Sequence, residues 1–102
     1  MTHTITAIHA KSFFQKTKGL ILENEIKPMF FFTRFGIHTF GLKEAIDVLI
    51  LDSNHKIVKL KTVSRNTIFL WSPRFNNVLE LPDGSIYKKK IRLGDHVALK
   101  FT

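Results

Sequence analysis

An almost continuous apolar run, AIDVLILD at residues 45–52, restricts the fold of this chain more than any other feature. A short run of this kind, rich in β-branched residues, is typical of a strand that is covered on both faces. It ends in DSNH, a group of residues that favour tight turns, and KIVKLKTV follows at residues 56–63. In this second segment we expect Val58 and Leu60 on one face and the intervening lysines on the other. The two segments therefore predict a β-hairpin whose first strand lies in the interior.

Asp47 places a carboxylate inside this apolar run, and the alternation of a strand puts Leu49 and Leu51 on its own face. An unpaired carboxylate in an apolar interior is strongly penalised. Asp47 is therefore either a paired structural anchor or part of a ligand site. As an anchor it would pair with Lys43 or with an arginine of a later connection, or it would accept backbone N–H bonds at the edge of a sheet. We favour the anchor and keep ligand contact as the alternative.

Short strand-like segments separated by turn residues make up most of the remaining chain, which predicts a mainly β fold with short helices. The architecture expected is a compact β-sandwich or a partly open β-barrel. No repeat or linker interrupts the sequence, so residues 1–102 are expected to form a single domain. The strands expected besides the hairpin are residues 4–10, 29–35, 36–42, 76–82 and 96–101; the short helices expected are residues 12–19 and 85–90; residues 64–75 are expected to form an exposed connection anchored by Phe69, Leu70 and Trp71.

The composition disfavours several classes of protein. The chain has no cysteine, so it can form neither a disulfide nor a cysteine-ligated metal site, and its five histidines lack the short paired spacing of metal ligands. No dinucleotide-binding, phosphate-binding or nucleophile-elbow motif is present. We therefore predict no cofactor and no metal, and a conventional enzyme is disfavoured. No apolar run approaches the ~20 residues that span a bilayer, and no signal peptide is evident, so we expect a cytoplasmic protein without a membrane span.

The net charge of +8 raises the question of an acidic partner. Residues 52–102 hold ten basic and four acidic side chains, a net of +6, so most of the excess lies in the second half. The nucleic-acid interpretation combines these cations into one electropositive surface. The plainer interpretation of the basic run at residues 88–92 is a lysine-rich helix face that is exposed to solvent. The residues proposed for nucleic-acid contact are Lys59, Lys61, Lys88, Lys89, Lys90 and Arg92.

Several segments in order resemble one known family. HTFGLKEAIDVLILDSNHKIV resembles the most recognisable stretch of the domain of unknown function 192 family; KTKGL, PMFFF, NVLELPDGS and IRLGDHV resemble its other elements. The likeness covers about residues 12–100. Leu42 stands where the family usually has methionine, and Glu44 and Ala45 replace a Phe-Pro pair. The resemblance implies a compact β-rich domain with short helices, and it implies no reaction, because the family is named for its lack of an assigned function.

The leading functional hypothesis is a non-enzymatic binding or interaction module with a cleft near HTFGLKEAID, for an unknown small-molecule or protein ligand. A nucleic-acid-binding protein is the first alternative. A small enzyme of unknown reaction is the second, and it would need Asp47 or Glu80 near His38. The candidate ligand-binding residues are His38, Thr39, Lys43, Asp47 and Trp71.

Overall fold

The computed structural model describes residues 1–9 and 27–102, and these residues form a mainly β fold as predicted. The helix expected at residues 12–19 lies outside the described residues. The elements follow one another as β1 (Thr2–His9), β2 (Met29–Phe32), β3 (Gly36–His38), β4 (Ile46–Leu51), β5 (Ile57–Val63), β6 (Ile68–Leu70), β7 (Asn77–Pro82), α2 (Ser85–Lys88) and β8 (His96–Phe101).

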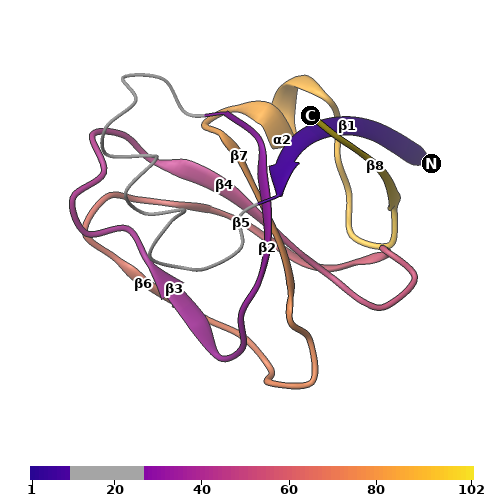
Figure 1. Cartoon of the computed structure of the whole chain (residues 1–102). Helices are drawn as coiled ribbons and strands as arrows, with labels where there is room; N and C mark the ends of the chain where they lie inside the picture. The colour runs from indigo at the N-terminus through magenta and orange to yellow at the C-terminus, as the bar shows by residue number, and fades with distance from the viewer. Residues whose placement is uncertain (10–26) are drawn as a thin grey trace.

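Six strands form one mixed sheet in the order β5-β4-β7-β2-β1-β8, and β3 pairs with β6 in a separate two-stranded ribbon. β1 runs parallel to its neighbours β2 and β8, whereas the other pairs are antiparallel. The sheet curls strongly into a half-barrel (Figure 1). Its two edges meet at one end, where the N–H of Ile57 donates to the carbonyl of Asp95 at 2.8 Å and that of Val97 to the carbonyl of His55 at 2.9 Å. The prediction of a partly open barrel is confirmed.

The curl separates the apolar interior into two clusters, one on each face of the sheet. We call the cluster on the concave face the barrel core, because all six strands contribute to it. We call the cluster on the other face the outer core, and the β3–β6 ribbon covers it. The barrel core comprises Ile5, Ala7, Phe30, Leu49, Leu51, Ile57, Leu79, Leu81, Ile91 and Val97. The outer core comprises Met29, Phe31, Ile37, Leu42, Ile46, Val48, Ile50, Val63, Phe69, Trp71 and Val78.

β4 lies between the two cores, which explains its apolar sequence. Ile46, Val48 and Ile50 point into the outer core. Leu49 and Leu51 point into the barrel core. Every residue of the strand is buried, so the prediction of a strand covered on both faces is confirmed.

The hairpin of β4 with β5 is also confirmed, and Asp52 organises its turn by accepting the N–H groups of Asn54 and Lys56 at 2.8 and 2.9 Å. The expected common face of Val58 and Leu60 is wrong. The register of the hairpin shifts by one residue near the end of β4, and such a bulge changes the face to which the following side chains point. Val58 therefore packs on the outer core and Leu60 on the barrel core.

The two strands expected at residues 29–35 and 36–42 are present in shorter form, but they do not share a sheet. β2 joins the six-stranded sheet, whereas β3 pairs with β6, which lies within the connection expected at residues 64–75. The pairing of β3 with β6 requires glycine at position 36, since an added Cβ would lie 2.6 Å from the carbonyl oxygen of Phe69. In β6, Leu70 is 62% exposed, so its expected role as an apolar anchor is wrong.

The expected helix at residues 85–90 is present as the single turn of α2, and Ser85 does not cap it. Gly84 takes the N-cap position with a φ of 89°, and the Ser85 hydroxyl donates to the carbonyl of Pro82 at 2.6 Å. Ile86 packs against the barrel core, so α2 covers part of this core beyond the strands. In residues 1–9 and 27–102 no helix is long and apolar enough to cross a membrane.

Asp95 holds the turn before β8 against β1. Its Oδ2 lies 2.8 Å from Nε2 of His3 and accepts the N–H of Arg92 at 3.0 Å. The hydrogen bond with His3, followed by the bond from the Arg92 amide, lowers the pKa of Asp95 from 3.8 to about 2. A carboxyl group whose pKa is lower in the folded state contributes stability above its unfolded pKa and loses that contribution as the pH falls through its folded pKa.

We therefore predict that Asp95→Asn makes the unfolding free energy less dependent on pH between 3.8 and about 2. Urea unfolding at about pH 5 and about pH 2.5 measures the difference for each variant. Asp83→Asn, at an exposed aspartate in the turn between β7 and α2, is the matched control and should retain the wild-type pH dependence. An Asp95→Asn variant with an unchanged pH dependence would contradict the prediction.

Candidate functional site

Asp47 is the second residue of β4 and is fully buried on the barrel-core side of the sheet. Its Oδ1 accepts the hydroxyl of Thr62 on β5 at 2.7 Å, and its Oδ2 accepts the backbone N–H of Ile86 in α2 at 2.7 Å. The carboxylate therefore joins three elements that are far apart in the sequence. One of the partners considered above, a backbone N–H group, is present. These contacts favour the anchor interpretation.

Thr39 and Trp71 are also buried, and their polar atoms are used inside the protein. The Thr39 hydroxyl donates to the carbonyl of Ser64 at 2.6 Å and accepts the N–H of Thr67 at 2.9 Å. The indole N–H of Trp71 donates to the carbonyl of Phe75 at 2.8 Å. Both side chains hold the ribbon and its connections over the outer core.

His38 and Lys43 lie nearer the surface than the other three candidates. The His38 ring stacks on Phe40 with their centroids 4.9 Å apart, and the N–H of Phe40 lies 3.3 Å from His38 Nδ1. Lys43 is exposed. Asp47 points to the opposite face of β4 from Trp71, because one lies on the barrel-core side and the other in the outer core. The structure therefore divides the five candidate residues between two faces of the sheet.

The buried acids are divided in the same way. Glu80 of β7 pairs in register with Val48 of β4, so its side chain lies on the outer-core face, whereas Asp47 pairs with Leu81 and faces the barrel core. Asp95 is bound to His3 at another end of the sheet. Within the described ranges, no three metal-binding side chains gather in one place.

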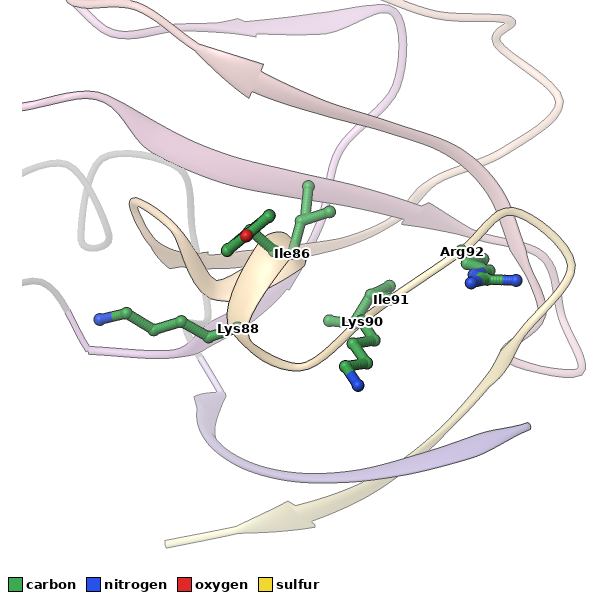
Figure 2. A pocket seen from close by; sticks show the side chains of 6 residues that line it. Ile86, Lys88, Lys90, Ile91 and Arg92 are labelled. Carbon is green, nitrogen blue, oxygen red and sulfur yellow. The ribbon is translucent and has the colours of Figure 1, made fainter.

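A hollow of about 590 Å³ lies beside α2. We call it the α2 hollow, and Figure 2 shows its labelled lining side chains. None of the five candidate ligand-binding residues lines it. Its lining residues are Ile86, Tyr87, Lys88, Lys90, Ile91 and Arg92.

The cations of the nucleic-acid hypothesis belong to two separate regions. Lys59 and Lys61 lie over the ring of Phe69, with Nζ to centroid distances of 5.2 and 6.0 Å. They are therefore on the same side of the sheet as the ribbon and the outer core. Lys88, Lys90 and Arg92 line the α2 hollow, on the side of the barrel core. The single electropositive surface that the sequence suggested is therefore divided in two by the sheet.

A surface that the sequence analysis did not predict covers the outside of the β3–β6 ribbon. Two of its residues belong to β6, Ile68 and Leu70, which are 61% and 62% exposed. The other two lie just before and just after β3, Phe35 and Phe40, which are 64% and 47% exposed. We call these four residues the ribbon surface. The run Ile-Phe-Leu of β6 carries a signal for it, since a short strand that is apolar at every position presents apolar side chains on both faces.

The comparisons with known proteins agree with this architecture. The model of the family named domain of unknown function 192 (DUF192), described as "Uncharacterized ACR", matches residues 1–99. The chain belongs to the DUF192 family. The UPF0127 protein PH1112 of Pyrococcus horikoshii is 31% identical over 94 residues, which cover 86% of this chain and 82% of that protein. DUF192 is a family of uncharacterised function, and the resemblance seen in the sequence is confirmed.

Two solved structures have the same fold as this DUF192 protein. One, from Sinorhizobium meliloti, is named provisionally as a transcription regulator; it is 18% identical, with a TM-score of 0.71 over 88% of this chain and 78% of its own. The other, a protein of unknown function from Novosphingobium aromaticivorans, is 15% identical, with a TM-score of 0.70 over 86% of this chain and 70% of its own. At these identities the likeness concerns the fold alone.

We predict that Asp47→Ala lowers the free energy of unfolding by about 2–4 kcal/mol, because it leaves two donors, at Thr62 and Ile86, without their buried acceptor. Urea denaturation followed by circular dichroism measures the change. Glu44→Ala removes an exposed carboxylate three residues earlier and should stay within about 0.5 kcal/mol of wild type. Equal stability of the two variants would contradict the anchor role.

Proposed function

We propose that this DUF192 protein is a non-catalytic interaction module that docks an acidic protein segment on the ribbon surface. The observation that carries the proposal is the exposure of four large apolar side chains beside the HTFGLKEAID segment. Single exposed apolar residues are ordinary, but several large ones on one short two-stranded ribbon indicate an interaction site. Phe40 brings the candidate segment into this surface.

The pairing of β3 with β6 places two large apolar side chains on the outer side of the ribbon. Gly36 lies opposite Leu70 in the ribbon, and a Cβ at Gly36 would meet Leu70 Cδ2 at 2.5 Å. The Leu70 side chain therefore lies across the glycine and is exposed on the outer side of the ribbon. Ile68 is the next residue of β6 with the same orientation, since side chains alternate along a strand.

The charges around the ribbon surface select an acidic partner. Lys59 places its amino group 3.1 Å from the carbonyl of Leu70. Arg65 reaches the carbonyl of Lys43 at 3.4 Å, and the exposed Arg34 directly precedes Phe35. A cationic border attracts an acidic segment and disfavours a second copy of this chain, whose net charge is also +8.

Selection of phage-displayed random peptides on the immobilised protein tests the proposal. The wild-type protein should enrich peptides that combine aspartate or glutamate with large apolar side chains. The double variant Phe35→Asn/Leu70→Thr should bind the selected peptides at least tenfold more weakly, since buried anchors at an interface contribute about 1–2 kcal/mol or more each. Asparagine is chosen because Phe35 has a φ of 72°, which asparagine tolerates better than most residues.

Tyr87→Ser is the matched control, because Tyr87 is also an exposed aromatic residue but lies at the α2 hollow. It should bind the selected peptides as the wild type does. Selected peptides without acidic residues, or peptides that bind the double variant equally well, would overturn the proposal. Binding to vesicles of anionic phospholipid that depends on Phe35 and Leu70, with no peptide enriched, would also overturn it, since the surface would then dock on a membrane.

A further inference from the structure

The α2 hollow combines cations with apolar and aromatic side chains, and the lining residues include no carboxylate. Ile91 belongs to the barrel core and Ile86 packs against it, so the apolar part of the lining is fixed to the body of the protein. Its volume of about 590 Å³ lies within the usual range for ligand sites of about 300–1,000 Å³.

The backbone of the hollow is held firmly in place. The N–H of Ile91 donates to the carbonyl of Ile86 at 3.0 Å, and the N–H of Lys90 to that of Tyr87 at 3.2 Å. Lys90 has a φ of 54°, so the chain leaves α2 through a left-handed residue that turns it sharply. Two carboxylates also bind the backbone of this segment. Asp47 accepts the backbone N–H of Ile86, and Asp95 accepts the backbone N–H of Arg92.

The three cations are spread along the hollow and do not converge on one point. Figure 2 shows the side chains of Lys88, Lys90 and Arg92 extending in different directions from the segment. A single compact phosphate would be contacted by one of them at a time. An extended chain of phosphates, with one charge at each repeat, can contact all three.

Tyr87 adds an aromatic ring that is exposed to solvent. It is 89% exposed and sits between the apolar Ile86 and the cationic Lys88 in a lining segment of the hollow. Exposed aromatic rings beside cations are the combination on which single-stranded nucleic acids bind, with bases stacked on the rings and phosphates along the cations.

From this arrangement we infer that the α2 hollow binds single-stranded nucleic acid, with Tyr87 stacking on a base and Lys88, Lys90 and Arg92 contacting phosphates. The site lies on the side of the barrel core and shares no residue with the ribbon surface. It is therefore independent of the docking proposed above. The phosphate contacts carry no sequence information, so binding is expected to be tolerant of base sequence.

Fluorescence anisotropy with a labelled oligothymidine tests the inference. The logarithm of the binding constant should fall with the logarithm of the salt concentration with a slope of about −2, since each of three phosphate contacts on a single strand contributes about −0.7. The Lys88→Gln variant should reduce the slope to about −1.4. Tyr87→Ala should weaken binding about tenfold with the slope unchanged, because stacking does not release counterions.

Two matched comparisons separate this site from general attraction to a basic protein. The double variant Lys59→Gln/Lys61→Gln removes two charges on the other side of the sheet and should bind the oligonucleotide within about twofold of wild type. The double variant Phe35→Asn/Leu70→Thr should also bind the oligonucleotide as the wild type does. This expectation holds whether or not the phage selection enriches a peptide. All substituted residues are exposed, so the variants are expected to fold, and circular dichroism checks this.

Three results would overturn the inference. The first is no change in anisotropy at low salt. The second is an equal loss of binding in the Lys59→Gln/Lys61→Gln variant, which would assign binding to net charge. The third is that Tyr87→Ala binds oligothymidine as tightly as wild type while inorganic polyphosphate competes fully, which would make the hollow a site for phosphate chains alone.

Discussion

The burial of β4 on both faces is the constraint on which the rest of the structure depends. A strand without a wet face needs an apolar layer on each side. The curl of the six-stranded sheet supplies one layer, the barrel core, and the β3–β6 ribbon supplies the other. Because the strand also carries Asp47, the barrel core must provide donors for a carboxylate. It does so through the hydroxyl of Thr62 and the N–H of Ile86, and α2 is thereby fixed where it covers the core.

The two layers also decide where the protein can bind anything. The ribbon uses Ile37 and Phe69 to cover the outer core, and this orientation turns Ile68 and Leu70 outward. On the other side, α2 uses Ile86 to cover the barrel core and leaves Tyr87 in solvent. Each covering element therefore presents a surface of its own, and both surfaces are bordered by cations. The two proposed binding surfaces follow from one architectural requirement, the covering of a doubly buried strand.

The departures from the family pattern are accommodated at positions of different character. Leu42, at a position where the family usually has methionine, belongs to the outer core. A core tolerates the exchange of two apolar side chains of similar size well. Glu44, in place of a phenylalanine, is exposed. It lies one residue beyond Lys43, whose carbonyl accepts the guanidinium of Arg65 at the border of the ribbon surface. The fold is shared with the two solved structures.

The sequence by itself determined the mainly β fold, the interior strand with its hairpin, and the need of Asp47 for a partner, because alternation, turn residues and the cost of burying a charge are local properties. It also indicated the family, through several motifs in one order. Only the tertiary structure decided that β3 pairs with β6, that a bulge separates Val58 from Leu60, and that Asp47 binds Ile86, which is 39 residues away. It likewise divided the five candidate residues and the two groups of lysines between the faces of the sheet. These outcomes depend on which strands become neighbours when the sheet curls, and the choice among distant partners is made by packing and not by any local pattern.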